Sequence, residues 1–474
     1  MGIINIKTKL VILLIFFGLT IKSYSQEQID DIEVIGISPL PGIEIDRNKV
    51  PNASQSLQEI DMNNSTATTI VDLLGEKLTG VTIKDVQNSP FQKNLDYRGF
   101  TAAPLLGESQ GLAVYLNGTR INEGFGDTLQ WELVPEAALT NIDLMSANPV
   151  FGLNALGGSL ALTTKKGLDY LNTDSSIENH FEVGGADWVN GNIELGAGTE
   201  TQGLYVAMEN SYDGGWRDNS AGDVKRLFVN YGILGDNFDY DFTFMNADSS
   251  LNGNGVSPTE LLKVRRESVF TWPDYTSNKV YLAASNANFY LEDNSTINTS
   301  IYYRRLIRDT LNADELDAEE CAEDNAAHAE QMEDDFGTAD EPICGEADGD
   351  NYEVLIDQYG NAISNNDSIR KYGLLNHSST MTVTWGGSAQ YNINTNYLDK
   401  MHNIIVGASI DKTRTAFHSR GELGQLHNNR TVTNLLNTDG GLITLESIRE
   451  HSGSSGGMED ENERGDVGSA QLAS

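Results

Sequence analysis

Residues 148–167 read NPVFGLNALGGSLALTTKKG, and the pattern of the sequence changes just after them. Gly152, Gly157 and Gly158 lie among aliphatic residues and lead directly into a predicted strand at 160–164. Glycine tolerates positive φ and the close approach of another backbone, because it has no Cβ atom. We therefore expect this stretch to turn, and packing alone accounts for its glycines.

The residues before this stretch predict a compact mixed α/β unit over 51–167. Ile70, Leu73 and Leu74 share one face of a predicted helix that stops at Gly80. The other predicted elements are strands at 80–86, 111–122 and 142–145, with a tight Asn-Gly turn at 117–118 and a short helix from Pro135.

Helical periodicity disappears after residue 170, and alternation of apolar and polar residues replaces it. A period of two is typical of strands that bury one face. Several of the predicted strands have roughly nine to thirteen residues, which suits a tilted crossing of a bilayer. We count about nine strands, near 176–186, 192–197, 203–213, 225–234, 238–244, 279–292, 297–304, 381–390 and 403–418.

The connections between these strands alternate between short and long. Turns such as GTETQG and GDN alternate with loops at about 248–278 and 309–377. A soluble sandwich also alternates apolar and polar residues, but tight turns on one side and long loops on the other are typical of a membrane barrel. The sequence therefore predicts antiparallel transmembrane β-barrel strands, with the loop at 309–377 outside the cell.

The first 25 residues have the features of a secretory signal peptide. Lys7 and Lys9 precede an apolar run at 10–19, and Ser23 and Ser25 fit the positions before a cleavage site. The run is too short for a membrane-spanning helix, and an uncleaved signal anchor is the alternative. We expect cleavage near Ser25-Gln26 and export of the mature chain.

The formal net charge of −38 argues against nucleic acid as a partner, because nucleic acids bind basic surfaces. Residues 309–350 contain seventeen Asp or Glu and no Lys or Arg. Cys321 and Cys344, the only cysteines, lie in that segment, and in an exported protein we expect them to form a disulfide. A metal site is not expected, because two lone cysteines rarely form one and EADGDNYE at 346–353 lacks the spacing of an EF-hand calcium loop.

Three motifs in combination carry a resemblance to a known family. They are LDYRGF at 95–100, GLAVYLNGTRINEGFGD at 111–127 and the glycine-rich stretch quoted above. In this order and spacing they resemble the plug of TonB-dependent outer-membrane receptors, over most of 30–167. In that family the glycine-rich element packs the end of the plug inside the barrel, so the resemblance implies that these glycines lie against a wall of strands. Arg98 and Arg120 could face a ligand or pair with acidic residues where plug meets barrel, and we favour pairing because a buried Arg needs a partner. The matching plug-motif residues are Arg98, Gly99, Phe100, Arg120, Gly152, Gly157 and Gly158.

The segment DDIEVIG at 30–36 resembles the TonB box of the same family. A short β-competent peptide on a tether can add as a strand to the edge of a partner's sheet. The resemblance therefore implies the C-terminal domain of TonB, with its inner-membrane energising complex, as a partner, and an ordinary linker is the alternative. The expected box residues are Asp31, Ile32, Glu33, Val34 and Ile35.

The resemblance implies an α+β plug followed by an antiparallel barrel of 22 strands, whereas only about nine or ten strands fit after residue 168. Open sheet edges are not tolerated in lipid. We therefore expect an N-terminal fragment, produced by truncation, a frameshift or an assembly break. The expected division is a signal peptide at 1–25, a TonB-box tether at 26–50, a plug domain at 51–167 and a partial barrel at 168–474, which includes the acidic loop at 309–377 and an irregular tail at 419–474.

The resemblance also implies a function, which is energised uptake of a scarce small nutrient such as a ferric chelate, cobalamin or another metal complex. The field of the acidic loop would repel anionic ferric siderophores and attract cationic or metal-rich ligands. A barrel-anchored surface binding or adhesion protein in the outer membrane is the alternative, and it would not need residues 30–36. An enzyme is not expected, because the seven His are scattered without nucleophile–base or metal-ligand spacing, and no cofactor is implied. The ligand and the residues that contact it are not determined by the sequence.

Overall fold

The predicted signal peptide and the expected box residues Asp31, Ile32 and Glu33 lie outside the part of the chain that the structure describes. None of the described helices combines the length and the apolar character needed to span a membrane. The computed structural model describes residues 34–36, 44–46, 53–146, 152–291, 295–321, 342–346, 352–366, 368–397, 400–436, 442–445 and 464–473.

Two small sheets and two helices form an N-terminal unit between residues 53 and 164. In the larger sheet the strand order is β3-β9-β10-β7-β8, and β10 (Gly158–Thr164) runs parallel to β7 (Leu112–Leu116). The remaining strands are β3 (Ser54–Gln58), β8 (Thr119–Arg120) and β9 (Leu139–Ser146), with β4 (Val81–Lys84), β5 (Asn94–Tyr97) and β6 (Phe100–Ala102) in the smaller sheet. The helices are α2 (Glu59–Asn63) and α3 (Ile70–Lys77), and three short 3-10 helices follow, η2 (Trp131–Leu133), η3 (Glu136–Ala138) and η5 (Gly167–Tyr170).

The predicted helix is confirmed as α3, and local chemistry explains where it begins. The Thr69 side chain accepts a hydrogen bond from the Asp72 N–H, which satisfies one of the free donors of the first turn. Ile70, Leu73 and Leu74 are buried in the main core, as their shared helical face predicts.

One antiparallel sheet follows the N-terminal unit, and each long strand pairs with the next along the chain. The fold prediction of an α+β unit followed by antiparallel strands is confirmed. Within the described ranges β11 pairs with β12 alone, so the sheet is open. The nine predicted strands are β11 (Ser176–Val183), β12 (Val189–Gly198), β13 (Gln202–Asp213), β14 (Gly222–Leu234), β15 (Phe238–Asn252), β16 (Asp274–Tyr290), β17 (Thr296–Glu315), β21 (Tyr372–Tyr397) and β22 (Lys400–Leu426).

Several predicted boundaries are wrong. β21 and β22 contain 26 and 27 residues, because the backbone ladder continues past the apolar alternation into polar residues. The helix predicted from Pro135 is the single turn η3, since β9 already begins at Leu139 to pair with β3 and β10. The acidic connection runs from after β17 to the start of β21 and holds a small sheet of β18 (Ala318–Glu320), β19 (Ile343–Glu346) and β20 (Tyr352–Val354).

The predicted irregular tail contains two strands that pair with β22, namely β23 (Val432–Asn434) and β24 (Arg464–Ala473). Neither strand shows strong apolar alternation in the sequence. The edge of β22 presents backbone N–H and C=O groups, and pairing with such an edge needs an extended backbone more than a particular side-chain pattern. Periodicity therefore did not identify these strands.

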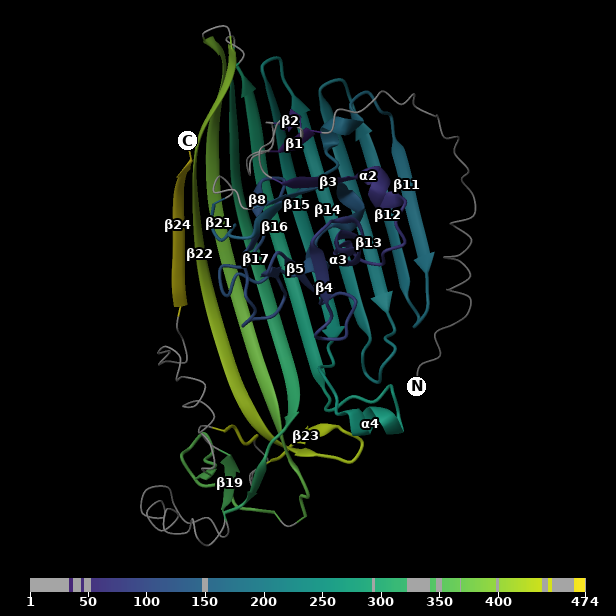
Figure 1. The fold of residues 1–474 in the computed structure, drawn as a ribbon, viewed down its shortest axis with the longest axis vertical. Helices are drawn as coiled ribbons and strands as arrows, with labels where there is room; N and C mark the ends of the chain where they lie inside the picture. Colours follow the sequence, from purple (N-terminus) through teal and green to yellow (C-terminus); the bar gives the residue numbers. More distant parts are fainter. Residues whose placement is uncertain are drawn as a thin grey trace.

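The sheet curves around the N-terminal unit, which lies against one face of it (Figure 1). A single hydrophobic core joins the two parts, because Leu112 and Leu144 of the unit share a buried cluster with Tyr205, Phe228 and Val280 of the sheet. The long connections gather at one end of the sheet with α4 (Thr259–Val264), β19 and β23, and we call this the long-loop end (Figure 1). The opposite end is the short-turn end, and the antiparallel pair β1 (Val34–Gly36) and β2 (Glu44–Asp46) lies towards it.

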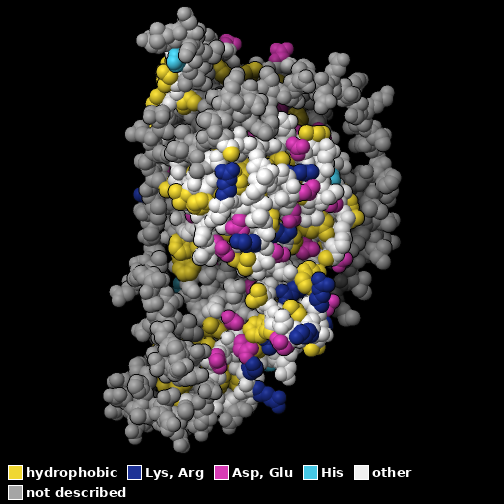
Figure 2. Space-filling view, viewed as in Figure 1, with side chains coloured by type: hydrophobic (Ala, Val, Ile, Leu, Met, Phe, Trp, Pro, Cys, Tyr) yellow, Lys and Arg dark blue, Asp and Glu magenta, His cyan; other side chains and the backbone are white. Residues whose placement is uncertain are grey.

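The open sheet covers the N-terminal unit on one side. The face of the unit turned away from the sheet mixes charged and apolar side chains (Figure 2). Leu106, Leu153 and Leu156 of the unit are 49%, 51% and 64% exposed, although most apolar residues of the unit are buried. The described strands therefore bury only part of the unit's apolar surface.

Candidate functional site

Gly157 and Gly158 of the opening stretch lie against other parts of the N-terminal unit. Arg98 (φ 53°) and Gly99 (φ 85°) form the tight turn that joins β5 to β6. The Phe100 ring that follows lies over Gly157, where a Cβ atom would overlap it. A Cβ atom at Gly158 would lie 2.7 Å from a backbone carbonyl oxygen of β9. Our expectation that these two glycines lie against the wall of strands is therefore wrong, because the N-terminal unit itself fills the space beside them.

Arg120 forms an ion pair inside the unit. Its guanidinium contacts the Asp127 carboxylate, which also accepts a hydrogen bond from Asn154, two residues after Gly152 (φ 77°). Burial raises the pKa of Asp127, while the positive charge of Arg120 opposes that rise. Arg98 is exposed, and its guanidinium carbon lies 5.0 Å from the centroid of the preceding tyrosine ring. The contacts described for these two arginines do not include the ion pair with the sheet that we expected.

A polar seam joins the unit to the sheet, and Arg226 of β14 lies at its centre. The Arg226 side chain is only 3% exposed. Its Nη1 donates to Glu209 of β13 at 2.8 Å, its Nη2 to Glu136 of η3 at 3.0 Å, and its Nε to the Glu132 carbonyl oxygen at 2.6 Å. Two carboxylates share this one cation, and burial raises the pKa of Glu136 to about 7 despite the attraction of Arg226.

A second seam contact lies where the chain passes from the unit into the sheet. Lys165 Nζ lies 2.7 Å from Glu194 of β12 and 3.1 Å from Glu59 of α2, so this side chain connects both parts. A Cβ atom at Gly167 would overlap the backbone of Gly203 in β13. This is the close approach of a glycine to the wall of strands, some ten residues later than we predicted.

The charged residues of the seam were not predicted from the sequence. Glu194, Glu209 and Arg226 occupy inward positions of alternating strands and are nearly fully buried. A charge at such a position needs a partner, so charged residues in phase with the inward set were the available signal. Their partners in the N-terminal unit could not be read from the same pattern.

A cavity of about 170 Å³ lies between the unit and the inner face of the sheet. Loops of the unit form one wall, and β16, β17, β21 and β22 form the other. The rings of Phe125 and Phe417 stack at one side with centroids 5.7 Å apart. Glu123 forms an ion pair with Arg304, and Arg308 Nη1 donates to a backbone carbonyl of the unit at 2.7 Å. We take this cavity as the candidate ligand site, because it combines apolar walls with a few converging polar groups.

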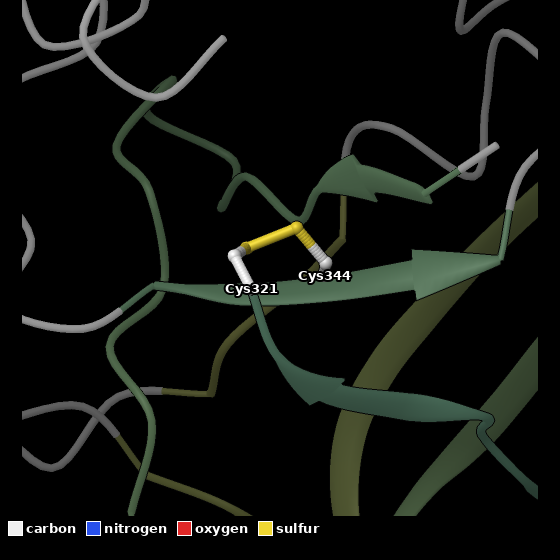
Figure 3. The surroundings of a disulfide bond; sticks show 2 residues. All are labelled: Cys321 and Cys344. Carbon is white, nitrogen blue, oxygen red and sulfur yellow. A yellow bond between two sulfur atoms is a disulfide. The ribbon is translucent and has the colours of Figure 1, made fainter. Parts of the chain in front are cut away.

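A disulfide joins Cys321 and Cys344 at the long-loop end (Figure 3). Cys344 lies in β19 and is 2% exposed. The neighbouring Ile343 belongs to a small buried cluster that includes Leu374 of β21 and Leu423 of β22. The disulfide thus links the start of the acidic connection to a small core built on the long strands.

A family model for the TonB-dependent receptor plug domain matches residues 46–159. The N-terminal unit therefore matches the plug domain of TonB-dependent receptors over nearly its whole length, and we call it the plug. The sheet that follows it is also similar to solved receptors. The pyoverdine outer-membrane receptor FpvA from Pseudomonas aeruginosa PAO1 matches 92% of this chain and 55% of its own, with a TM-score of 0.58 and 10% identity.

Two further solved structures have the same fold. The ferric citrate transporter FecA matches 89% of this chain and 52% of its own, with a TM-score of 0.56 and 14% identity. BauA, the ferric preacinetobactin receptor from Acinetobacter baumannii, matches 79% of this chain and 49% of its own, with a TM-score of 0.54 and 10% identity. A search of curated proteins gave no match to this chain.

The chain spans about half the length of these solved receptors, and at such low identity the similarity concerns the fold. These solved proteins are two receptors and a transporter. In the described part of the plug and sheet, no group of three or more His, Cys, Asp or Glu side chains is placed to hold a metal ion. The cavity between plug and sheet is therefore the site on which a functional proposal can be built.

Proposed function

We propose that the protein is an outer-membrane receptor that takes up a scarce small nutrient with energy supplied through TonB. The plug carries this proposal, because it lies against the inner face of an antiparallel sheet and leaves a cavity between the two. FecA is named as a ferric citrate transporter and FpvA as a pyoverdine receptor. These names support a ferric chelate as the nutrient, with cobalamin or another metal complex as further candidates.

In this proposal the long-loop end faces the outside and the short-turn end faces the periplasm. The sheet's outward side carries exposed apolar residues, among them Leu204, Phe242 and Trp385, which are 42%, 38% and 50% exposed. Side chains of this kind suit contact with lipid, since a membrane barrel places apolar residues outward at alternate positions. The mature chain would begin at Gln26, after removal of the signal peptide.

Energy would enter through the N-terminal tether. The proposed TonB box is residues 31–35, of which Val34 and Ile35 belong to β1. A strand of this length can join the edge of a sheet in the C-terminal domain of TonB, with main-chain hydrogen bonds providing the grip. Force on the tether would then reach the plug and open a path past the cavity.

Deletion of residues 31–35 tests this function in cells that depend on the protein. We expect uptake of labelled nutrient to stop while binding of the nutrient to the cell surface continues. Deletion of residues 38–42, also in the tether, is the matched control and should leave uptake largely intact. The alternative, a surface binding or adhesion protein, predicts that neither deletion changes function, and that result would reject the uptake proposal.

A further inference from the structure

The sheet side of the cavity carries a row of neutral hydroxyl groups beside Leu306, Arg308, Asn312 and Phe417. Thr276 of β16 pairs directly with Thr310 of β17, which pairs directly with Ser378 of β21. The hydroxyl oxygens of Thr310 and Ser378 are 2.6 Å apart. Thr380 and Thr382 continue the same face of β21, because alternate residues of a strand point to one side. All five residues line the cavity, and we call them the hydroxyl wall.

The plug side of the cavity adds neutral polar groups. Gln130 is 2% exposed, and its Nε2 donates to a backbone carbonyl of the plug at 3.2 Å. Its Oε1 has no hydrogen-bond partner among the described residues. A buried acceptor left in this way is costly, and a donor on a ligand would satisfy it. Thr128 and Gln87 lie on the same side of the cavity.

The ionisable groups of the lining do not form a charged site. Glu123 and Arg308 have opposite charges. Glu123 forms an ion pair with Arg304, whereas Arg308 donates to a backbone carbonyl and its Nε has no hydrogen-bond partner among the described residues. Sites for polycarboxylates surround the ligand with several Arg or Lys side chains, which make strong charge-assisted hydrogen bonds. The described lining offers a single Arg and no Lys. β17 also leads from this cavity into the segment with seventeen carboxylates, whose field disfavours polyanions.

We propose that this cavity selects an uncharged ligand rich in hydroxyl, carbonyl or amide groups over a polyanionic chelate. The inference rests on the proposed function, and it names the substrate class of the same site. The hydroxyl wall and Gln130 supply donors and acceptors, and the stacked rings of Phe125 and Phe417 supply an apolar surface for ring or chain carbons of the ligand. Neutral ferric hydroxamates and oligosaccharides share this chemistry.

Binding to the purified full-length chain in detergent tests the selection, with three probes in separate titrations. The probes are a charge-neutral ferric trihydroxamate, a linear oligosaccharide and ferric citrate. We expect one of the neutral probes to bind at least about tenfold more tightly than ferric citrate, and which one binds identifies the source of the ligand. Equal or tighter binding of ferric citrate overturns the inference, and so does the absence of binding by both neutral probes at millimolar concentration.

Substitutions in the hydroxyl wall test whether these residues cause the preference for a neutral ligand. Thr310→Val and Thr380→Val each remove a lining hydroxyl at nearly constant volume and should weaken binding of the neutral probe by about five- to tenfold. Thr384→Val, on the same strand but outside the lining, is the matched control and should bind as the unmodified protein does. Thr310→Lys should raise the affinity for ferric citrate and lower that for the neutral probe. Unchanged affinities in all the wall variants overturn the inference, whereas TonB dependence is tested separately by the 31–35 deletion.

Discussion

Replacing Arg226 by methionine removes the cation at the centre of the polar seam between plug and sheet. The Arg226 and Glu209 side chains are 3% and 5% exposed, so the substitution leaves Glu209 and Glu136 without their shared partner in a space with little water. Removing one partner of a buried ion pair costs about 3–5 kcal/mol. We expect Arg226→Met to lower the free energy of opening of the plug by about this amount, which is a large share of the stability of an ordinary domain.

Hydrogen exchange of α3 and β9, measured in rising urea on the full-length protein in detergent, reports this opening free energy. Lys225→Met is the matched control, because Lys225 is the preceding residue, is 68% exposed and pairs with Asp223 at 3.2 Å. An exposed pair of this kind contributes at most about 1 kcal/mol. Combining Arg226→Met with Glu136→Gln and Glu209→Gln should recover much of the loss, because no buried carboxylate is then left unpaired. A change of less than about 1 kcal/mol in Arg226→Met would show that the seam does not hold the plug.

Three further outcomes follow from the described contacts. The pKa of Glu136 is raised from its ordinary 4.5 to about 7, so the folded protein holds this proton more firmly than the unfolded chain. The contribution of Glu136 to stability is complete at low pH and is lost as the pH rises through about 7. Plug opening should therefore become easier from about pH 5 to about pH 8 in the unmodified protein, and less steeply so in Glu136→Gln, where Asp127, whose pKa burial also raises, still titrates. Gly167→Ala should lower the midpoint of thermal denaturation and reduce the free energy of unfolding by about 1–3 kcal/mol, because the added Cβ would overlap the Gly203 backbone. Gly185→Ala is the control and should be near neutral, because nothing lies within 4 Å of its added atom. Cys321→Ser should lower the local stability of the acidic connection by about 3 kcal/mol, since the disulfide closes a sequence separation of 23 residues. The acidic connection should then be more sensitive to protease. Equal proteolysis of the oxidised and the Cys321→Ser proteins would contradict this.

The strands of the sheet could be predicted from sequence because each pairs with its neighbour along the chain and carries a period of two. The ends of β21 and β22 could not, since the backbone ladder continues where the side-chain pattern stops. The helix α3 was predictable for a similar reason, because Ile70, Leu73 and Leu74 share one face.

The polar seam and the cavity depend on strand register and on packing between the plug and the sheet. The residue pattern of a single segment carries no information about either. Arg226 meets Glu136, a residue 90 positions away, and a shift of one residue in β14 would turn its side chain to the other face. The hydroxyl wall takes Thr276, Thr310 and Ser378 from three separate strands. The error over Gly157 has the same origin, because a glycine shows that a neighbour comes close but does not say whether the neighbour is Phe100 or a strand of the sheet.

The junction between β10 and η5 limits how the plug can move. β10 ends at Thr164 and η5 begins at Gly167, so two residues separate the plug's central strand from the point where Gly167 meets β13 of the sheet. Two residues reach about 7 Å at most. The plug can therefore rotate about this junction but cannot move far from it. The opposite extremity of the plug, β3, is bound along one side by five residue pairs to β9. A pull on the N-terminus would therefore load the edge strand β3 before the rest of the plug, while the short junction to η5 keeps the C-terminal end of the plug against the sheet.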